Sequence, residues 1–225
     1  MKNKNIKLAI FDFDGTLYNK KGFAFRLVMK NLSMAFVALT ERIIRKKFKG
    51  KDFGSAENYY DNFFTEITKR NLFFTAKYYE KWYFKRYLPS FCKILEKHYN
   101  ADERVVGIFD YLHKNNIKIA INSDYPFVGE RMQAIGLDYE QNAQLHYFSS
   151  EDYGALKPAT RPFLEIANKF NCEPSNCIVI GDRADTEGEC AKKTGMDFIQ
   201  ISFKKDKNDN AVSWEELEKI LKNNE

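Results

Sequence analysis

Asp12 and Asp14 are two carboxylates separated by one residue, and Gly15 follows them directly. A chain that turns at a glycine can bring both carboxylates into one pocket. Asp12 can then attack an electrophilic atom, while Asp14 donates a proton to the leaving group and later takes one from water. The two residues therefore predict a site of nucleophilic and acid-base catalysis.

Three later positions carry side chains that suit the same chemistry. Ser123 follows an apolar run that ends at Asn122, Lys157 precedes a proline, and Asp182 follows the run CIVIG. Hydroxyl, amide and ammonium groups donate hydrogen bonds to the oxygens of an anion. We expect Ser123, Asn122 and Lys157 to bind substrate, and we expect the whole set to surround a phosphoryl group.

Carboxylates repel a phosphate dianion, so this arrangement requires cations. Asp12 and Asp182 can supply the hard oxygen ligands that Mg²⁺ prefers, and Lys157 adds a compact positive charge. Asp185 and Glu187 follow shortly afterwards. Each is a candidate for a carboxylate that supports the ion without binding it directly. The sequence thus predicts a magnesium-dependent site.

The elements that position these residues alternate in type. Short apolar runs predict buried strands, and the segments between them place apolar residues at helical spacing. This alternation indicates an α/β fold with a parallel sheet covered by helices on both faces. Ligands of such sheets bind beyond the carboxyl ends of the strands. The predicted strands are 7–13, 117–122, 177–181 and 197–201, with a weaker one at 146–149.

Residues 18–100 differ from the rest of the chain. They show helical stripes without strand-like runs, and they hold 18 Lys and Arg against 7 Asp and Glu, whereas the remainder holds 18 against 24. We interpret 18–100 as an all-helical insertion, and 1–17 together with 101–225 as the α/β core. The basic run at 42–51 suits a solvated helix, and contact with an anionic surface is the alternative interpretation.

Several other classes of protein are disfavoured. The most apolar stretch, 22–40, is interrupted by Arg26 and Lys30, so no membrane span is predicted. The N-terminus lacks a signal-peptide pattern and the four cysteines lack CxxC pairing, which favours a cytoplasmic protein without disulfides or a zinc site. We expect no nucleic-acid partner, and the oligomeric state stays open.

Four motifs resemble those of the haloacid dehalogenase superfamily: FDFDGTL at 11–17, INSDYP at 121–126, GALKP at 154–158 and GDRADTEGECAKKTGM at 181–196. The resemblance covers the whole chain. It implies a Rossmann-like core, a phosphoaspartate on Asp12, and Mg²⁺ bound by Asp12, the backbone carbonyl of Asp14, and Asp182. The long gap between the first two motifs is similar to members with a helical type-one cap, which makes 18–100 the cap.

Two residues depart from the family pattern. Asp124 stands where many relatives have Asn, and Glu187 stands where Asp is common, so that either Asp185 or Glu187 can support the metal. Asp14 favours phosphate chemistry, because the dehalogenating members lack a carboxylate at its position. The resemblance therefore implies hydrolysis of a small phosphorylated metabolite, with cap movement controlling access and excluding water.

Other functions are compatible with these motifs. A phosphomutase of the same superfamily forms the same intermediate, and a phosphonatase also uses a lysine from the cap. A non-catalytic module that binds an anion or a lipid surface through 42–51 is a further alternative. The intact set of motif residues argues against that last interpretation.

Overall fold

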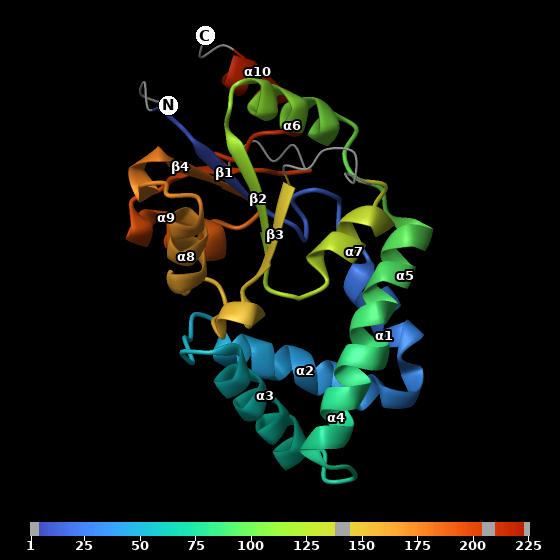
Figure 1. The fold of residues 1–225 in the computed structure, drawn as a ribbon. Coiled ribbons are helices and arrows are strands. Elements are labelled where there is room, and N and C mark those ends of the chain that lie inside the picture. Colours follow the sequence, from blue (N-terminus) through green and yellow to red (C-terminus); the bar gives the residue numbers. More distant parts are fainter. Residues whose placement is uncertain (1–4, 138–144, 204–209, 223–225) are drawn as a thin grey trace.

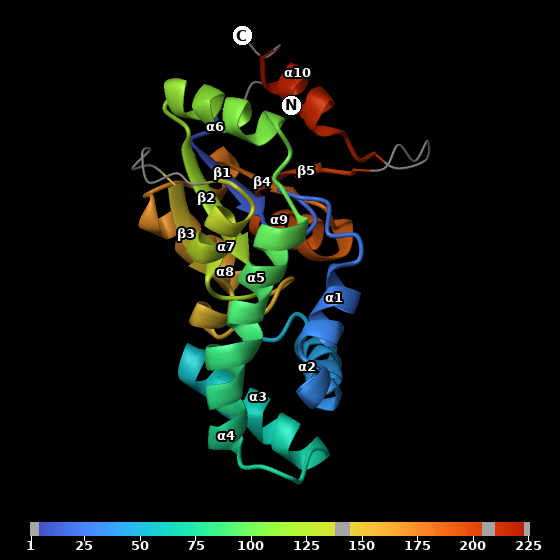
Figure 2. The same cartoon turned by 90° about the vertical axis from the view of Figure 1, so that its right-hand side faces the viewer.

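The computed structural model has two lobes, drawn one above the other in Figure 1 and Figure 2. The structure describes residues 5–137, 145–203 and 210–222. The upper lobe contains the sheet, and the lower lobe is helical. We call residues 18–100 the cap and the remainder the core; residues 1–4, 138–144, 204–209 and 223–225 of the predicted core lie outside the described residues.

Five parallel strands form one sheet in the order β3-β2-β1-β4-β5. The first strand in the chain is therefore the central one, and Asp12 at its end pairs in register with Asn122 of β2. Each predicted strand is present, including the weaker one. Their bounds are β1 Leu8–Asp12, β2 Lys118–Ser123, β3 Leu145–Ser149, β4 Cys177–Gly181 and β5 Asp197–Gln200.

The two faces of the sheet pack against different helices. Ala9 and Phe11 of β1 belong to one hydrophobic cluster with α6, α7 and α10, whereas Leu8 and Ile10 belong to a second cluster with α8 and α9. Successive strand residues point to opposite faces, which explains this alternation. The predicted α/β architecture is confirmed. The core helices are α6 Arg104–Lys114, α7 Val128–Ala134, α8 Arg161–Lys169, α9 Glu189–Thr194 and α10 Trp214–Lys222.

The cap consists of helices connected by short turns. Ser55 and Thr75 begin two of these helices, and each side chain accepts a hydrogen bond from a backbone N–H of the first turn. A π-helical turn, Tyr83–Tyr87, joins α4 to α5, so that these helices run on as one long rod. The bounds are α1 Phe23–Lys30, α2 Ala35–Phe48, α3 Ala56–Arg70, α4 Ala76–Trp82 and α5 Leu88–His98.

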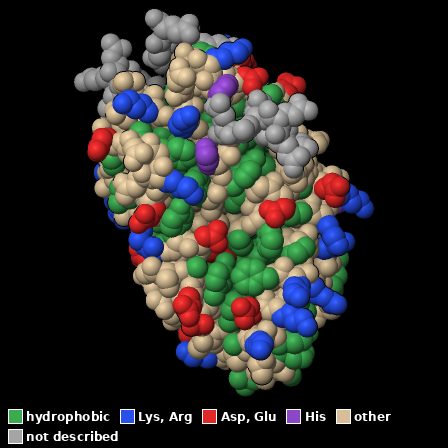
Figure 3. All heavy atoms as spheres, viewed as in Figure 1, with side chains coloured by type: hydrophobic (Ala, Val, Ile, Leu, Met, Phe, Trp, Pro, Cys, Tyr) green, Lys and Arg blue, Asp and Glu red, His purple; other side chains and the backbone are tan. Residues whose placement is uncertain are grey.

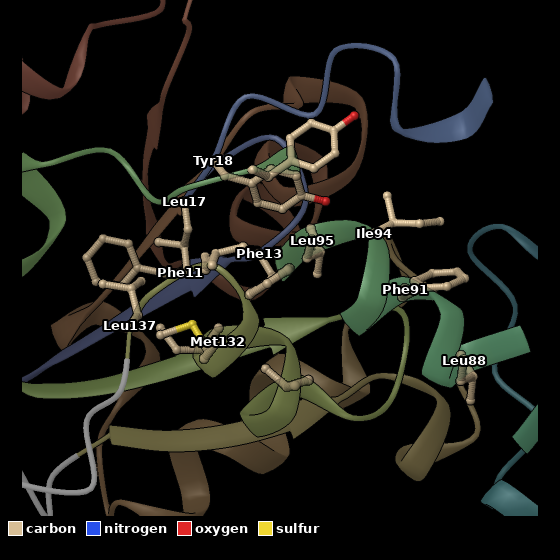
Figure 4. Close-up of a cluster of buried hydrophobic side chains, with 14 of the residues drawn as sticks. Phe11, Phe13, Leu17, Tyr18, Leu88, Phe91, Ile94, Leu95, Met132 and Leu137 are labelled. Carbon is tan, nitrogen blue, oxygen red and sulfur yellow. The ribbon is translucent and has the colours of Figure 1, made fainter. Parts of the chain in front are cut away.

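A single hydrophobic cluster extends through both lobes. Figure 4 shows its central part, where Phe11 and Phe13 from β1 and the turn after it lie near Phe91 and Leu95 of α5 and Met132 of α7. α5 therefore contributes to the packing beneath the first strand as well as to the cap. The buried aromatic side chains of the cap belong to this same cluster.

Glu151, from the short helix Glu151–Tyr153 after β3, joins the core to the cap through a buried charge. Its carboxylate accepts hydrogen bonds from Tyr60 (2.7 Å), Tyr83 (2.9 Å) and Tyr59 (3.3 Å), and it is paired with Arg45 of α2. These four partners all come from the cap. The interaction neutralises a carboxylate that would otherwise be costly to bury.

Backbone hydrogen bonds reinforce this junction beside Lys157. Gly50 donates to the carbonyl of Leu156 (3.2 Å), and Leu156 donates to the carbonyl of Lys51 (3.1 Å). Gly154 has a φ of 67°, and a Cβ there would lie 2.0 Å from the carbonyl oxygen of Ser55. A glycine is therefore required at this point, where the core backbone runs directly against the cap backbone.

In the described ranges, no single helix combines the length and the hydropathy needed to cross a membrane. α1 and α2 meet the length and composition criteria together, but this pair of helices is bent by 86°.

We expect Glu151→Ala to lower the free energy of unfolding by about 3–5 kcal/mol, because the change leaves a buried guanidinium group without one of its carboxylate partners. Urea denaturation of the purified protein measures the difference. The matched control is Glu96→Ala on the exposed side of α5, which we expect to change the free energy by less than about 0.5 kcal/mol. A loss below about 1 kcal/mol for Glu151→Ala would show that the junction contributes little.

Candidate active site

The ends of β1 and β4 and the segment before α8 bring most of the predicted site residues to one cavity between the core and the cap. The cavity has a volume of about 490 Å³. Asp12, Asp14, Lys157, Asp182 and Glu187 all line it. The sequence prediction that these residues meet at the carboxyl edge of the sheet agrees with this geometry.

Asp12 lies at the floor of the cavity and is almost fully buried. The hydroxyl of Thr16 donates a hydrogen bond to its Oδ2 (3.0 Å), and the ammonium group of Lys157 contacts its Oδ1. Burial raises the pKa of Asp12 to about 7, because the positive charge of Lys157 offsets the loss of solvation only in part. The carboxylate thus requires further positive charge to stay ionised.

Lys157 is itself buried, and three acceptors surround its ammonium group. Besides Asp12, it donates to the backbone carbonyl of Asn122 (3.0 Å) and to Glu187 (2.8 Å). Burial alone lowers the pKa of a lysine, but the two carboxylates outweigh this effect and raise it. Lys157 is therefore a fixed positive charge beside the predicted nucleophile.

Asp14 is held by a network that the sequence did not reveal. Tyr18 donates a hydrogen bond to one carboxylate oxygen (2.7 Å), Ser123 donates to the other (3.2 Å), and Arg131 of α7 forms an ion pair with it. Burial raises the pKa of Asp14, but the charge and hydrogen bonds of Arg131 outweigh it, and the pKa is lowered. The ionised form of Asp14 is favoured.

Ser123 and Asn122 lie behind the wall of the cavity rather than in its lining. Both side chains are buried, and Ser123 receives a hydrogen bond from Arg131 (2.9 Å). The oxygen of the Asn122 side chain accepts a long hydrogen bond from Ser150 (3.4 Å). In this arrangement the two residues position Asp14 and Lys157, and their predicted contact with substrate stays a prediction.

Asp182 and the carbonyl of Asp14 share a positively charged partner. The ammonium group of Lys20 lies 2.5 Å from Asp182 Oδ2 and 2.8 Å from the Asp14 carbonyl oxygen. Gly15 has a φ of 89°, and a Cβ there would lie 2.5 Å from Asp182 Oδ2. A glycine therefore leaves room for a cation at these oxygens, as the FDFDGTL motif requires.

This set of donors fits Mg²⁺. Among the described residues, no group of three His, Cys, Asp or Glu side chains is placed so that these side chains alone could hold a metal ion. The expected ligands are two carboxylates and one carbonyl, and Mg²⁺ commonly keeps several waters in its octahedron. The ammonium group of Lys20 stands in for positive charge at two of these three oxygens.

The two candidate supporting carboxylates occupy different surroundings. Glu187 is buried in the cavity wall, where Lys157 and the hydroxyl of Thr186 (2.6 Å) hold it. Asp185 points outward, and it is paired with Lys49 and with Arg183 (2.7 Å) at the surface. Of the two candidates, Glu187 lies in the wall of the cavity and Asp185 lies outside it.

The cap forms the opposite wall of the cavity. Its apolar part is lined by Phe23, Leu27 and Phe91, and Tyr125 of the core lies beside them. The guanidinium group of Arg45 lies 3.5 Å from the centre of the Tyr125 ring. This wall presents mostly apolar and aromatic surface to whatever group leaves the site.

Solved structures with the same fold come from proteins of low sequence identity. A 2-haloacid dehalogenase from Pseudomonas syringae pv. Tomato DC3000 gives a TM-score of 0.65 at 14% identity, over 98% of this chain and 100% of that one. A structure described as a predicted phosphoglycolate phosphatase from Haemophilus somnus 129pt gives 0.62 at 18%, over 97% and 99%. A HAD phosphatase from Thermococcus onnurineus gives 0.58 at 20%, over 96% and 98%. At these identities the likeness concerns the fold.

No curated protein gives a significant match to the sequence. The family model of haloacid dehalogenase-like hydrolases matches residues 9–201, which include all four motifs and every site residue described above. The chain therefore belongs to the haloacid dehalogenase-like hydrolase family.

Proposed function

We propose that the protein is a magnesium-dependent phosphatase that hydrolyses a small phosphomonoester through a phosphoaspartate on Asp12. The observation that carries this proposal is the position of Asp12, Asp14, Lys157 and Asp182 around one cavity. A nucleophile, an acid-base group, a fixed ammonium group and a hard oxygen ligand are the parts that phosphoryl transfer through an aspartate needs.

In the first step, a carboxylate oxygen of Asp12 attacks the phosphorus atom, and the bond to the leaving oxygen breaks. Asp14 donates its proton to that oxygen. Arg131 favours the ionised form of Asp14, and the approach of a phosphate dianion offsets this effect because like charges disfavour ionisation. The same dianion is held by the ammonium group of Lys157.

In the second step, water attacks the phosphorus atom of the phosphoaspartate, and Asp14 takes a proton from that water. Phosphate leaves and the carboxylate of Asp12 is restored. Arg131 stabilises Asp14 in the ionised state that accepts the proton. The hydroxyl of Tyr18 keeps the carboxylate oriented, because it donates to the second oxygen of Asp14.

Asp12, Asp182 and the carbonyl of Asp14 would hold Mg²⁺. When bound there, the ion would neutralise charge on the phosphoryl oxygens as the transition state forms. The raised pKa values of Asp12 and Asp182 support this assignment, because both carboxylates lose more solvation on burial than their lysine partners restore.

The chemistry of the cavity argues against two alternative activities, those of a dehalogenase and of a phosphonatase. Asp14 provides the acid-base carboxylate that a dehalogenase does not need. A phosphonatase requires an uncharged cap lysine at the site, and among the described cap lysines only Lys20 lines the cavity. Burial lowers the pKa of Lys20, but Asp182 outweighs this and the pKa is raised, so that Lys20 carries a charge and is a poor nucleophile.

We expect Asp12→Asn to reduce magnesium-dependent release of phosphate from p-nitrophenyl phosphate by at least ~10³-fold, because the amide cannot form the phosphoaspartate. A phosphate assay gives the rate, and phosphorus NMR shows whether inorganic phosphate or a transferred phosphoryl group is the product. The control is Asp61→Asn on the exposed surface of α3, which should retain the wild-type rate. Full activity of Asp12→Asn would refute the assignment.

Glu187→Gln should lower the rate of phosphate release by about 10- to 100-fold and raise the concentration of Mg²⁺ needed for half-maximal activity, since the charge behind the site is lost. Asp185→Asn removes the same charge from the surface, and we expect its rate to stay within about threefold of the wild type. Titration of both variants with Mg²⁺ makes the comparison. The opposite ranking would assign the supporting role to Asp185.

Lys20→Met should strengthen binding of Mg²⁺ to the free protein by about three- to tenfold, because the ammonium group competes for Asp182 and the Asp14 carbonyl. Isothermal titration calorimetry with Mg²⁺ measures this without any turnover. Lys21→Met, at the exposed neighbouring position, is the matched control and should bind like the wild type. Unchanged or weaker binding by Lys20→Met would argue against competition.

A further inference from the structure

The outer side of α1, the short helix Leu32–Met34 and α2 carries a row of exposed apolar residues. They follow one another at intervals of four and three residues, which is the period of a helical face. Half of the twelve exposed large apolar residues of the described ranges are in this row. We call it the α1–α2 face, and its members are Phe25, Met29, Leu32, Phe36, Leu39 and Ile43.

Packing within the chain does not account for this face. Leu27, Val37 and Ile44 on the inner side of the same helices are buried and complete the cap. Phe25 and Phe36 on the outer side are 70% and 62% exposed. Figure 2 shows α1 and α2 at the right-hand edge of the cap, and α3, α4 and α5 lie to their left, on their inner side. The two helices therefore carry apolar residues on their outer side as well as on the inner side that packs within the cap.

The segment that carries the α1–α2 face is itself strongly basic. Between residues 15 and 51 the sequence has ten Lys and Arg and one acidic residue, Glu41, which is fully buried. Arg26, Lys30 and Lys46 of the same helices are exposed. The face drawn in Figure 3 is different, because acidic and basic side chains are interspersed on it.

This charge pattern identifies the partner. Two copies of the chain that met through the α1–α2 face would bring the exposed basic side chains of both copies together, and this segment supplies no exposed acidic residue of its own to pair with them. A surface of anionic lipid offers both phosphate groups for the lysines and arginines and an apolar layer for the aromatic and aliphatic side chains. We propose that the α1–α2 face docks the protein on the surface of an anionic lipid bilayer.

The shape of the two helices suits a position in the interface plane. An amphipathic helix with apolar and basic residues inserts its apolar side between the headgroups and leaves long basic side chains at the level of the phosphates. α1 and α2 are short and are bent by 86° relative to each other, so that they can lie along a surface as an L-shaped pair. Each basic residue near the membrane contributes about fivefold to the binding constant.

Docking is independent of the proposed phosphatase activity, because none of the six apolar residues lines the catalytic cavity. The face lies on the outer side of helices whose inner residues Ala24 and Leu27 line that cavity. A docked protein therefore keeps its catalytic cavity on the side of α1 and α2 that faces away from the lipid.

Sedimentation of the full chain with vesicles tests the proposal. We expect binding to vesicles of equal parts phosphatidylcholine and phosphatidylglycerol, and at least about tenfold weaker binding to phosphatidylcholine alone. Raising NaCl from about 0.05 M to about 0.5 M should weaken binding to the anionic vesicles, because salt screens the basic side chains. Equal binding to both kinds of vesicle, or no binding to the anionic ones, would overturn the proposal.

Two variants locate the contact. Phe25→Ser with Phe36→Ser should reduce binding to anionic vesicles at least about tenfold, and Lys30→Glu with Lys46→Glu should do the same. The matched control is Phe73→Ser in the α3–α4 turn, where an even more exposed aromatic residue lies off the face and should not be needed. All three proteins should keep the wild-type circular dichroism and rate of phosphate release.

Three results would contradict this location. The first is wild-type binding by both double variants, and the second is a loss in Phe73→Ser as large as that in the double variants. The third is a concentration-dependent dimer, detected by light scattering, that dissociates in Phe25→Ser with Phe36→Ser while the wild type fails to bind vesicles. That last outcome would assign the α1–α2 face to a second copy of the chain.

Discussion

Repulsion among buried carboxylates is the constraint on which the site depends. Asp12, Asp14, Asp182 and Glu187 line one small cavity, and each acidic group is stable there only beside a positive charge. Lys157 forms ion pairs with Asp12 and Glu187. Arg131 forms one with Asp14, and Lys20 forms one with Asp182. These cations come from three different elements of the fold. The sheet brings the acids together, and the surrounding segments must therefore be in place before the acids can remain ionised.

Much of this arrangement could be predicted from the sequence, because strand runs and motif spacing are local features. The five strands and the positions of Asp12 and Asp182 at their ends follow from apolar runs and the residues after them, and Lys157 is found from the motif GALKP. Arg131 and Glu151 could not be found in this way. Arg131 lies eight residues after Ser123 without any motif, and its partner Asp14 is 117 residues away along the chain. Such pairs depend on how helices pack, which periodicity does not specify.

The choice between Asp185 and Glu187 illustrates the same limit. Asp185 and Glu187 follow Asp182 by three and five residues, and both carry the same charge. The π-helical turn Ala184–Gly188 directs Glu187 into the core and leaves Asp185 at the surface. Local geometry of this kind is decided by the packing of Thr186 and Glu187 under the strands. The sequence alone therefore left two candidates, of which only Glu187 lies in the wall of the cavity.

The junction beside Lys157 couples the two lobes mechanically. The backbone of Leu156 exchanges hydrogen bonds with Gly50 and Lys51, and the N–H of Lys157 is held by Asp124 on the core side (3.1 Å). Lys157, whose ammonium group contacts Asp12, is therefore part of a segment that is hydrogen-bonded to both lobes. A displacement of the helical lobe would either move this segment or break its hydrogen bonds to Gly50 and Lys51. The position of the ammonium group beside Asp12 is therefore tied to how the helical lobe is seated on the sheet.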